Sequence, residues 1–219
     1  MNHRISARAA ITTAVAIAVT LAISAPAAGA SASNGVEPFQ TAVFAGGCFW
    51  GVDAVFRHVK GVSGVESGYA GGSADTATYD RVSGGNTGHA EAVRVRFDPA
   101  QVTYGQLLGV FFNVAHDPTQ LNRQGPDYGS QYRSAVFYTG PEQRQLTEDY
   151  VRDLAGAKTF KSRIVTEITP LKEFFPAEAY HQDYLAQHPN QPYIVINDLP
   201  KLDLLRQRFP DLYRPTGAR

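Results

Sequence analysis

An apolar run, a pair of glycines and an amphipathic segment follow one another without interruption in the first third of this chain. Residues 41–45 (TAVFA) read as a short buried strand, and Gly46-Gly47 supplies a turn. Apolar residues then recur at the spacing of one helix face, at Val52, Val55, Phe56 and Val59. This order predicts strand, turn and helix, and it places Cys48 at the helix N-terminus. Unpaired backbone N–H groups and the helix dipole favour a thiolate there.

Cys48 is the only cysteine of the chain, and its pattern admits two interpretations. A lone cysteine is often a small buried hydrophobic residue without chemistry. Glycines on both sides, and the aromatic pair Phe49-Trp50 directly after it, favour a reactive thiol in a pocket with aromatic walls. The pattern alone leaves both interpretations open.

The N-terminus predicts export. Arg4 and Arg8 precede an apolar run that ends before Ala28-Gly29-Ala30, which is typical of a secretory signal peptide with its cleavage site. We expect residues 1–30 to be this signal, 31–39 a short leader, 40–213 a single catalytic domain and 214–219 a C-terminal tail. An uncleaved anchor is the alternative, because the cleavage site is inferred from sequence alone. The mature form is expected to be secreted or extracytoplasmic, with no membrane association.

Charge and cysteine content argue against nucleic-acid binding and against an internal disulfide. The chain has 20 basic and 20 acidic residues, and the predicted signal removes two arginines and no acidic residue. A slightly negative mature chain gives no indication of nucleic-acid binding. A single cysteine cannot form an internal disulfide, so an exported chain of this kind carries a free thiol.

Periodicity and turn residues outline the remaining elements. Residues 90–97 alternate as a strand, and Thr103 and Gln106 have capping-box spacing before a predicted helix over 107–114. Glycine-rich and polar loops are expected over 71–88 and 117–131. Further strands are expected over 133–139 and 163–168, and further helices from about 140, over 177–185 and over 201–209. Because strands and helices mix without strict alternation, we predict an α+β two-layer sandwich.

Glu91 follows from the alternation of the strand over 90–97. It shares a face with Val93, Val95 and Phe97, which a folded chain must bury. A buried carboxyl has a raised pKa and can act as a general acid near neutral pH. The alternative is that Glu91 lies at a frayed strand end and points into solvent.

The histidines do not predict a metal site. His89-Ala90-Glu91 resembles part of a zinc-deaminase signature, but that signature needs P-C-x-x-C downstream and the chain has no second cysteine. No histidines have ligand spacing. His181 is interpreted as a surface or packing residue. The loop over 124–132 is either ordinary turn chemistry or a polar lid over the cysteine that includes Asp127 and Tyr132, with Tyr79 as a further donor.

Several ordered motifs together resemble the A class of peptide-methionine sulfoxide reductases (MsrA). The match covers roughly Thr41 to Asp211. Its motifs are residues 47–51 (GCFWG), 68–72 (GYAGG), the stretch 79–91 that begins with Tyr79 and ends in GHAE, 116–119 (HDPT) and 124–133. The resemblance implies reduction of the S epimer of methionine sulfoxide, free or in oxidised proteins and peptides. It also implies a ferredoxin-like-related sandwich with a mixed sheet.

The resemblance further implies roles for individual residues. Cys48 would be the nucleophile and Glu91 the general acid, with polar support from Tyr79, Asp127 and Tyr132. Phe49 and Trp50 would enclose the methyl group of the substrate. The expected protein is a monomer without metal or bound cofactor.

One departure from the family concerns regeneration of the enzyme. Many relatives carry a second, resolving cysteine near the C-terminus, and residues 199–219 contain none. A sulfenic acid on Cys48 would therefore need an external thiol or a thioredoxin-like protein. Two rival interpretations are a secreted cysteine hydrolase or acyltransferase, which needs a histidine base near Cys48, and a non-catalytic binding module.

Overall fold

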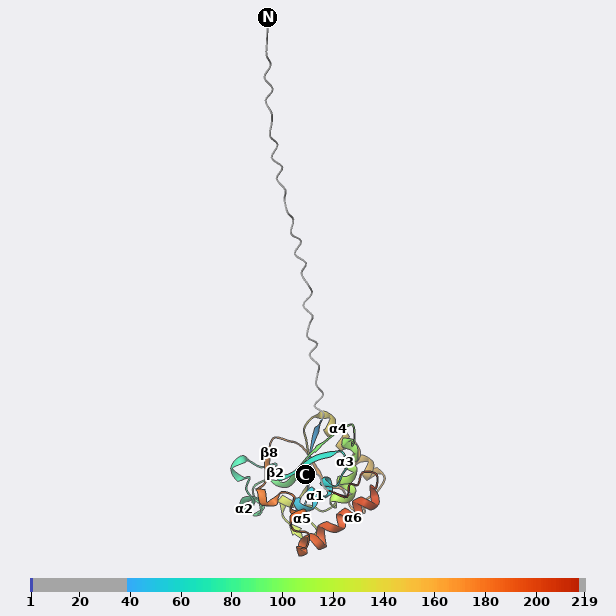
Figure 1. Cartoon of the computed structure of the whole chain (residues 1–219). Coiled ribbons are helices and arrows are strands. Elements are labelled where there is room, and N and C mark those ends of the chain that lie inside the picture. The colour runs from blue at the N-terminus through green and yellow to red at the C-terminus, as the bar shows by residue number, and fades with distance from the viewer. Residues whose placement is uncertain (2–38, 217–219) are drawn as a thin grey trace. The chain divides into compact units, whose positions relative to one another are not determined.

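A mixed six-stranded sheet supports the candidate site (Figure 1). The structure is a computed structural model that describes Met1 and residues 39–216. The sheet strands are β1 (Gln40–Gly46), β2 (Val62–Ala70), β3 (Ala90–Phe97), β6 (Ser134–Tyr138), β7 (Glu167–Pro170) and β8 (Phe174–Pro176). Their order is β7-β6-β1-β3-β2-β8, and neighbours are antiparallel except β6 and β7. A separate hairpin pairs β4 (Arg123–Gln124) with β5 (Asp127–Tyr128).

The helices differ in type. The α-helices are α1 (Phe49–Arg57), α2 (Tyr79–Val82), α3 (Tyr104–Val110), α4 (Pro141–Gly156), α5 (Tyr184–Gln187) and α6 (Leu199–Arg208). Three 3₁₀ turns are η1 (Ala74–Thr76), η3 (Ser130–Tyr132) and η4 (Ala179–His181), and two π-helical turns are η2 (Phe111–Ala115) and η5 (Ile194–Asp198). Helices α1, α5 and α6 lie together, and α3 lies beside α4 (Figure 1). Within residues 39–216, no helix is both long and apolar enough to span a membrane.

The two faces of the sheet bury different side chains. Ala42 and Phe44 of β1 face the helices and join the main core with residues of α1 and α3. Val43 and Ala45 face the other way, into a smaller cluster rich in alanine that Phe174 helps to cover. β3 pairs antiparallel between β1 and β2, which makes β1-α1-β2 a split βαβ unit. The architecture is the predicted α+β two-layer sandwich with a mixed sheet.

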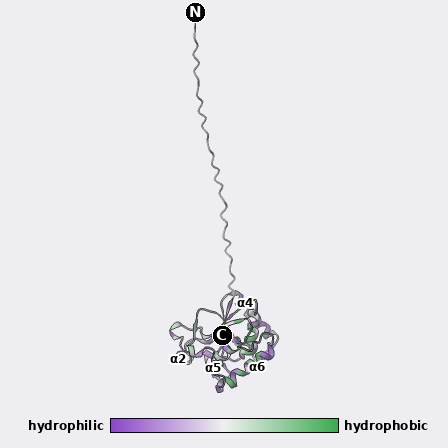
Figure 2. Ribbon diagram, in the orientation of Figure 1, coloured by the Kyte–Doolittle hydropathy of each residue, from purple (hydrophilic) through white to green (hydrophobic). Residues whose placement is uncertain are grey.

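Strong local patterns predicted their elements correctly. The strands around residues 41–45, 90–97 and 133–139 are β1, β3 and β6, and the helix after Cys48 is α1. The capping box of Thr103 and Gln106 is present in full, although the helix that it opens begins at Tyr104 and gives way to the π-helical turn η2. Helix α6 corresponds to the predicted helix over 201–209 and carries both hydrophobic and hydrophilic residues (Figure 2).

Two predictions in the C-terminal third are wrong in detail. The strand expected over 163–168 starts only at Glu167, because the Val165 N–H donates to the Pro118 carbonyl rather than to a strand. The helix expected over 177–185 is divided into η4 and α5. Asp183 adopts the left-handed conformation at φ 50°, which ends any continuous helix.

Other elements were not predicted at all. β2 contains two glycines and two serines, a composition typical of loops, and β8 is three residues that end in proline. The loop expected over 71–88 contains η1 and α2, and the loop over 117–131 contains the β4–β5 hairpin.

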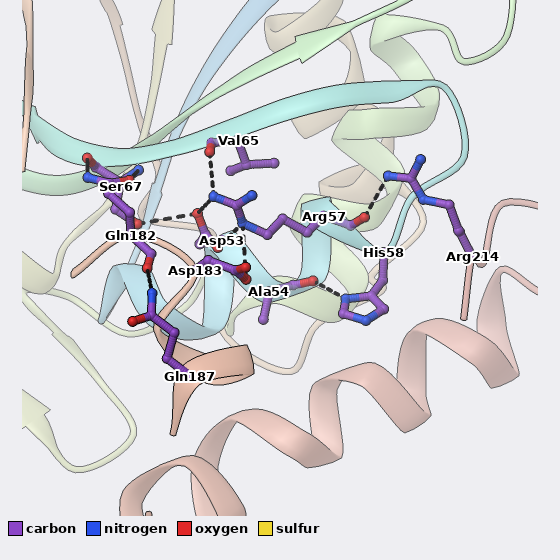
Figure 3. Close-up of polar contacts among 10 residues, drawn as sticks. All are labelled: Asp53, Ala54, Arg57, His58, Val65, Ser67, Gln182, Asp183, Gln187 and Arg214. Atoms are coloured by element: carbon purple, nitrogen blue, oxygen red, sulfur yellow. Dashed lines mark hydrogen bonds and ion pairs between the residues drawn. The ribbon is translucent and has the colours of Figure 1, made fainter. Parts of the chain in front are cut away.

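A buried polar network joins the C-terminal segment to α1 (Figure 3). Arg57 Nε lies 2.6 Å from Asp53 Oδ1 and 3.6 Å from Asp183, and Arg57 Nη2 donates to the Val65 carbonyl at 2.7 Å. The Gln182 side chain accepts from the Ser67 N–H and donates to the Ser67 carbonyl, both at 2.9 Å. It thereby satisfies the backbone groups that a neighbouring strand would otherwise bind. Burial raises the pKa of Asp53 to about 6 against the opposing charge of Arg57. The network therefore holds the segment around residue 182 against α1 and the edge of β2.

Candidate active site

Cys48 lies in the turn between β1 and α1, at the N-cap of the helix. Gly47 has φ +90°, which side chains other than glycine rarely adopt, and a Cβ there would lie 2.5 Å from Gln124 Cβ. Both the backbone conformation and the close approach of the β4 strand therefore require glycine. The predicted position of Cys48 at the start of a helix is confirmed.

Glu91 lies on the face of β3 that packs against α1, and its side chain is buried. Its Oε2 accepts a hydrogen bond from the Phe49 N–H at 3.0 Å, so the carboxyl lies beside the residue that follows Cys48. Burial raises the pKa of Glu91 to about 8; the Phe49 N–H opposes this rise, and the charge of Asp127 adds to it. The predicted burial of Glu91 is confirmed, and at neutral pH its carboxyl holds a proton.

The surroundings of the Cys48 thiol differ from the expectation. The helix N-terminus alone predicts a lowered pKa, but burial raises the pKa of the thiol, and the carboxylates Glu91 and Asp198 raise it further. The Trp50 backbone N–H and the Lys201 ammonium act in the opposite direction. The resting thiol is therefore protonated, because loss of hydration outweighs the helix dipole. Neutral Glu91 exerts less of this repulsion than its carboxylate would.

Two predicted phenols share the electrostatic environment of Glu91. Burial raises the pKa of Tyr79 to about 12, and the charges of Glu91 and Cys48 contribute to the rise. Burial also raises the pKa of Tyr132, with further contributions from Glu91 and Asp127. Both hydroxyls keep their protons at neutral pH and can donate hydrogen bonds.

Asp127 and Cys48 line the same cleft of about 160 Å³. The Tyr193 hydroxyl, contributed by the C-terminal segment, donates a hydrogen bond to Asp127 Oδ2. The other lining residues are Gln124, Gly125, Pro126, Tyr193, Asn197 and Lys201. The structure therefore brings the predicted loop over 124–132 to the cysteine, as the lid interpretation expects.

Phe49 and Trp50 have different surroundings. The Phe49 ring is buried, with its centroid 4.9 Å from that of His181 and 5.9 Å from that of Tyr69. Trp50 is partly exposed and stacks on Tyr184 at 3.7 Å. Its indole N–H donates to His181 Nδ1 at 3.1 Å. The Trp50 ring is thus fixed by Tyr184 and His181, and Phe49 is the more deeply packed of the two.

The residues around His181 belong to the site, although the sequence did not predict this. The His181 ring is buried and lies 4.4 Å from the ring of Tyr79 as well as against Phe49 and Trp50, so the packing interpretation is correct and the surface interpretation is wrong. Glu178, three residues earlier, accepts from the Tyr79 N–H at 2.9 Å and from the Tyr69 hydroxyl at 2.8 Å. Segment 178–181 therefore holds Tyr69 and Tyr79 through Glu178, and through His181 it packs against the two residues that follow Cys48.

Tyr193, Asp198 and Lys201 were also missed. The Tyr193 hydroxyl bonds Asp127, 66 residues away, and although Asp198 and Lys201 pair with each other, no local spacing links any of the three to Cys48. The one available signal was that residues 180–193 contain three tyrosines and two histidines near polar residues, which is unusual for a simple surface helix.

Two other buried histidines, His116 and His89, bond to partners other than Cys48. His116 Nε2 lies 2.7 Å from Ser134 Oγ and its Nδ1 3.0 Å from the Phe111 carbonyl, and burial lowers its pKa to about 4. His89 bonds Gly72 and Ser73. Among the residues that the structure describes, no group of three or more His, Cys, Asp or Glu side chains could hold a metal ion.

Comparison with known proteins identifies the family. The family model described as peptide methionine sulfoxide reductase matches residues 40–212. The chain belongs to this family. It is 58% identical over 174 residues to peptide methionine sulfoxide reductase MsrA 2 of Mesorhizobium japonicum, covering 80% of this chain and 89% of that protein. It is 53% identical over 172 residues to MsrA 2 of Synechocystis sp., covering 78% of this chain and 80% of that protein.

Solved structures agree with this family. Methionine sulfoxide reductase A of Corynebacterium diphtheriae has 40% sequence identity and a TM-score of 0.62, covering 71% of this chain and 77% of that chain. Reduced Mxr1 of Saccharomyces cerevisiae has 33% identity and a TM-score of 0.64, covering 70% and 88%. These matches confirm the resemblance seen in the motifs and the MsrA-type fold. They give no support to the hydrolase interpretation.

Proposed function

We propose that this chain reduces the S epimer of methionine sulfoxide to methionine, in oxidised proteins and as the free amino acid. Membership of the reductase family supports the reaction class. The observation that carries the mechanism is the buried Glu91 carboxyl, protonated at neutral pH and hydrogen-bonded to the residue after Cys48.

The first chemical step needs both residues. The Cys48 thiolate attacks the sulfoxide sulfur, the S–O bond of the substrate breaks, and the oxygen is transferred to the Cys48 sulfur. Glu91 supplies the proton that the oxygen requires, so the products are methionine, a Cys48 sulfenic acid and the Glu91 carboxylate. The substrate sulfur gains the two electrons that the Cys48 sulfur loses.

The remaining site residues stabilise this step. The hydroxyls of Tyr79 and Tyr132, both protonated at neutral pH, donate hydrogen bonds as negative charge grows on the oxygen. Asp127 holds the Tyr193 hydroxyl at the other side of the cleft. The exposed part of the Trp50 ring, fixed by Tyr184 and His181, contacts the methyl group, and Phe49 supports it from the core.

An external thiol then regenerates the enzyme. A thiolate attacks the sulfenic sulfur and forms a mixed disulfide with loss of water, and a second thiol releases Cys48. Because the chain has one cysteine, this step cannot occur internally. We propose a thioredoxin-like protein or a small thiol as the reductant, with no bound cofactor.

Location and assembly are further proposals that rest on sequence. We propose that residues 1–30 direct export and are removed, with 31–39 as leader and a monomeric catalytic domain over 40–213; the signal lies outside the described residues. Mass analysis of protein recovered outside the cytoplasm is expected to give an N-terminus at Ser31, and an intact Met1 there would refute cleavage.

Assay of separated sulfoxide epimers tests the reaction directly. With dithiothreitol as reductant, the S epimer is expected to be converted and the R epimer left unchanged. Cys48→Ser is expected to be inactive on both. Conversion of the R epimer at an equal rate, or activity in Cys48→Ser, would contradict the proposed function.

A further inference from the structure

An ion pair lies where the π-helical turn η5 meets α6. Lys201 Nζ is 3.1 Å from Asp198 Oδ1. The Asp198 side chain is fully buried, whereas that of Lys201 is 20% exposed. Asp198 Oδ2 has no hydrogen-bond partner among the described residues. A buried carboxylate with a single partner is costly, so this pair needs an explanation beyond the stability of α6.

The pair packs against the first turn of the helix that carries the cysteine. A Cβ on Gly51 would lie 2.0 Å from Asp198 Oδ1 and 2.6 Å from Lys201 Nζ. Gly51 is three residues after Cys48, one turn along α1. Glycine at this position therefore creates the space that the ion pair occupies.

Lys201 also lines the cleft that contains Cys48. Of the eight residues that line this cleft, Lys201 is the one with a positive charge, and Asp127 is the one acid. Lys201 and Cys48 therefore border the same small cleft, and the Lys201 side chain keeps partial access to solvent.

Apart from Lys201, the charged side chains around Cys48 are acids that disfavour a thiolate, and the remaining titratable side chains are neutral. Glu91 of β3 and Asp198 of η5 raise the pKa of the thiol, and Lys201 lowers it. The phenols that interact with Cys48 are Tyr79, Tyr132 and Tyr193, and all have raised pKa values. His116 contacts the end of β1 beside Gly46 and is neutral, with a pKa lowered to about 4.

We propose that Lys201, held in place by Asp198, is a positioning residue that stabilises the negative charge on the Cys48 sulfur when the thiol loses its proton to solvent. A neighbouring lysine is an established means of favouring a thiolate. Here its ammonium supplies the positive charge that a protonated histidine supplies beside other reactive cysteines, while the proton itself goes to solvent. The inference rests on the proposed function, because it takes Cys48 as the nucleophile.

The test is the pH dependence of Cys48 alkylation in the mature full-length chain. Cys48 is the only cysteine, so iodoacetamide uptake reports on this thiol alone. Lys201→Met and Lys201→Gln are expected to move the midpoint upward by about one pH unit, a roughly tenfold loss of reactivity near neutral pH. Lys201→Arg is expected to restore most of the reactivity. Lys172→Met, a change at an exposed lysine, serves as the control.

Asp198→Asn gives a result of opposite sign. It removes a negative charge near the sulfur and leaves the ammonium, so its midpoint is expected to move downward. A merely structural pair would shift both sets of variants in the same direction, as the site loosens. Such a common shift, or an unchanged midpoint in both Lys201→Met and Lys201→Gln, would overturn the inference.

Alkylation needs neither sulfoxide nor reductant, so the two proposals fail separately. If Cys48→Ser retains reductase activity, the proposed function fails whatever Lys201 does. If substitutions of Lys201 leave the alkylation midpoint unchanged while Cys48→Ser is inactive, only the proposed role of Lys201 fails.

Discussion

Replacing Glu91 by glutamine is expected to lower activity and raise stability at the same time. The amide has a shape similar to the carboxyl and its oxygen can still accept from the Phe49 N–H, but it has no proton to transfer. Loss of general acid catalysis costs about 10²- to 10⁴-fold in turnover. The structure predicts the pH dependence of both effects.

The activity of the wild type depends on the raised pKa of Glu91. With a pKa of about 8 the carboxyl is about 90% protonated at pH 7, whereas at the ordinary value of 4.5 it would be about 0.3% protonated. Burial therefore increases the protonated fraction of Glu91 at pH 7 by about 300-fold. Above about pH 8 the single-turnover rate of the wild type is expected to fall by about tenfold per pH unit, as far as loss of the acid form limits it.

The raised pKa of Glu91, which favours activity, lowers the stability of the folded chain. Between pH 4.5 and about 8 the folded chain keeps the Glu91 proton and the unfolded chain loses it, so the free energy of unfolding falls as pH rises. At about 1.4 kcal/mol per pH unit this amounts to about 3 kcal/mol at pH 7. Glu91→Gln lacks this term, so its stability relative to wild type is expected to rise with pH until about pH 8.

Denaturant unfolding from about pH 5 to about pH 9, with single-turnover methionine release on the same samples, measures both effects. Glu173→Gln, at an exposed glutamate, is the matched control and is expected to change neither. Parallel stability curves for wild type and Glu91→Gln would refute the buried acid. Wild-type turnover in Glu91→Gln, with chemistry limiting, would refute its role.

Three further outcomes are expected. Without reductant and with excess sulfoxide, the wild type releases about one methionine per enzyme and a sulfenic-acid probe labels Cys48, because one thiol stores one turnover; two or more methionines per enzyme would require another electron source. Trp50→Ala raises KM and lowers kcat on a peptide substrate, because the wall that positions the methylsulfoxide is lost; unchanged kinetics in a folded variant would remove Trp50 from the site. Gly47→Ala lowers the melting temperature by an amount matching at least about 1 kcal/mol, because φ +90° and the contact with Gln124 both exclude a Cβ; an unchanged melting curve would contradict this.

Sequence reasoning succeeded where information is local. The alternation over β3 placed Glu91 on the buried face, and the order of apolar run, glycines and helix placed Cys48 at an N-cap. The capping box of Thr103 and Gln106 is present as predicted, although α3 begins at Tyr104 and not at Leu107. In each case one continuous segment carries the whole pattern.

It failed where a partner far along the chain decides the structure. β2 is a strand because β3 and β8 pair with it, although its own composition is that of a loop. His181 joins the site through Trp50, 131 residues away, and Glu178 through Tyr79, 99 residues away. The expected thiolate failed for a related reason, because the helix dipole can be read from the sequence and the burial of the sulfur cannot.

Because the C-terminal segment packs against α1, the site is complete only after the last part of the chain has been synthesised. The nucleophile and acid lie in the first half of the chain, whereas Glu178, His181 and Tyr193, which hold the surrounding walls, come near its end. The Arg57 network cannot close until Gln182 and Asp183 are present. A ribosome-bound chain that lacks these residues therefore exposes Cys48 without its pocket, and no N-terminal fragment can hold a finished site.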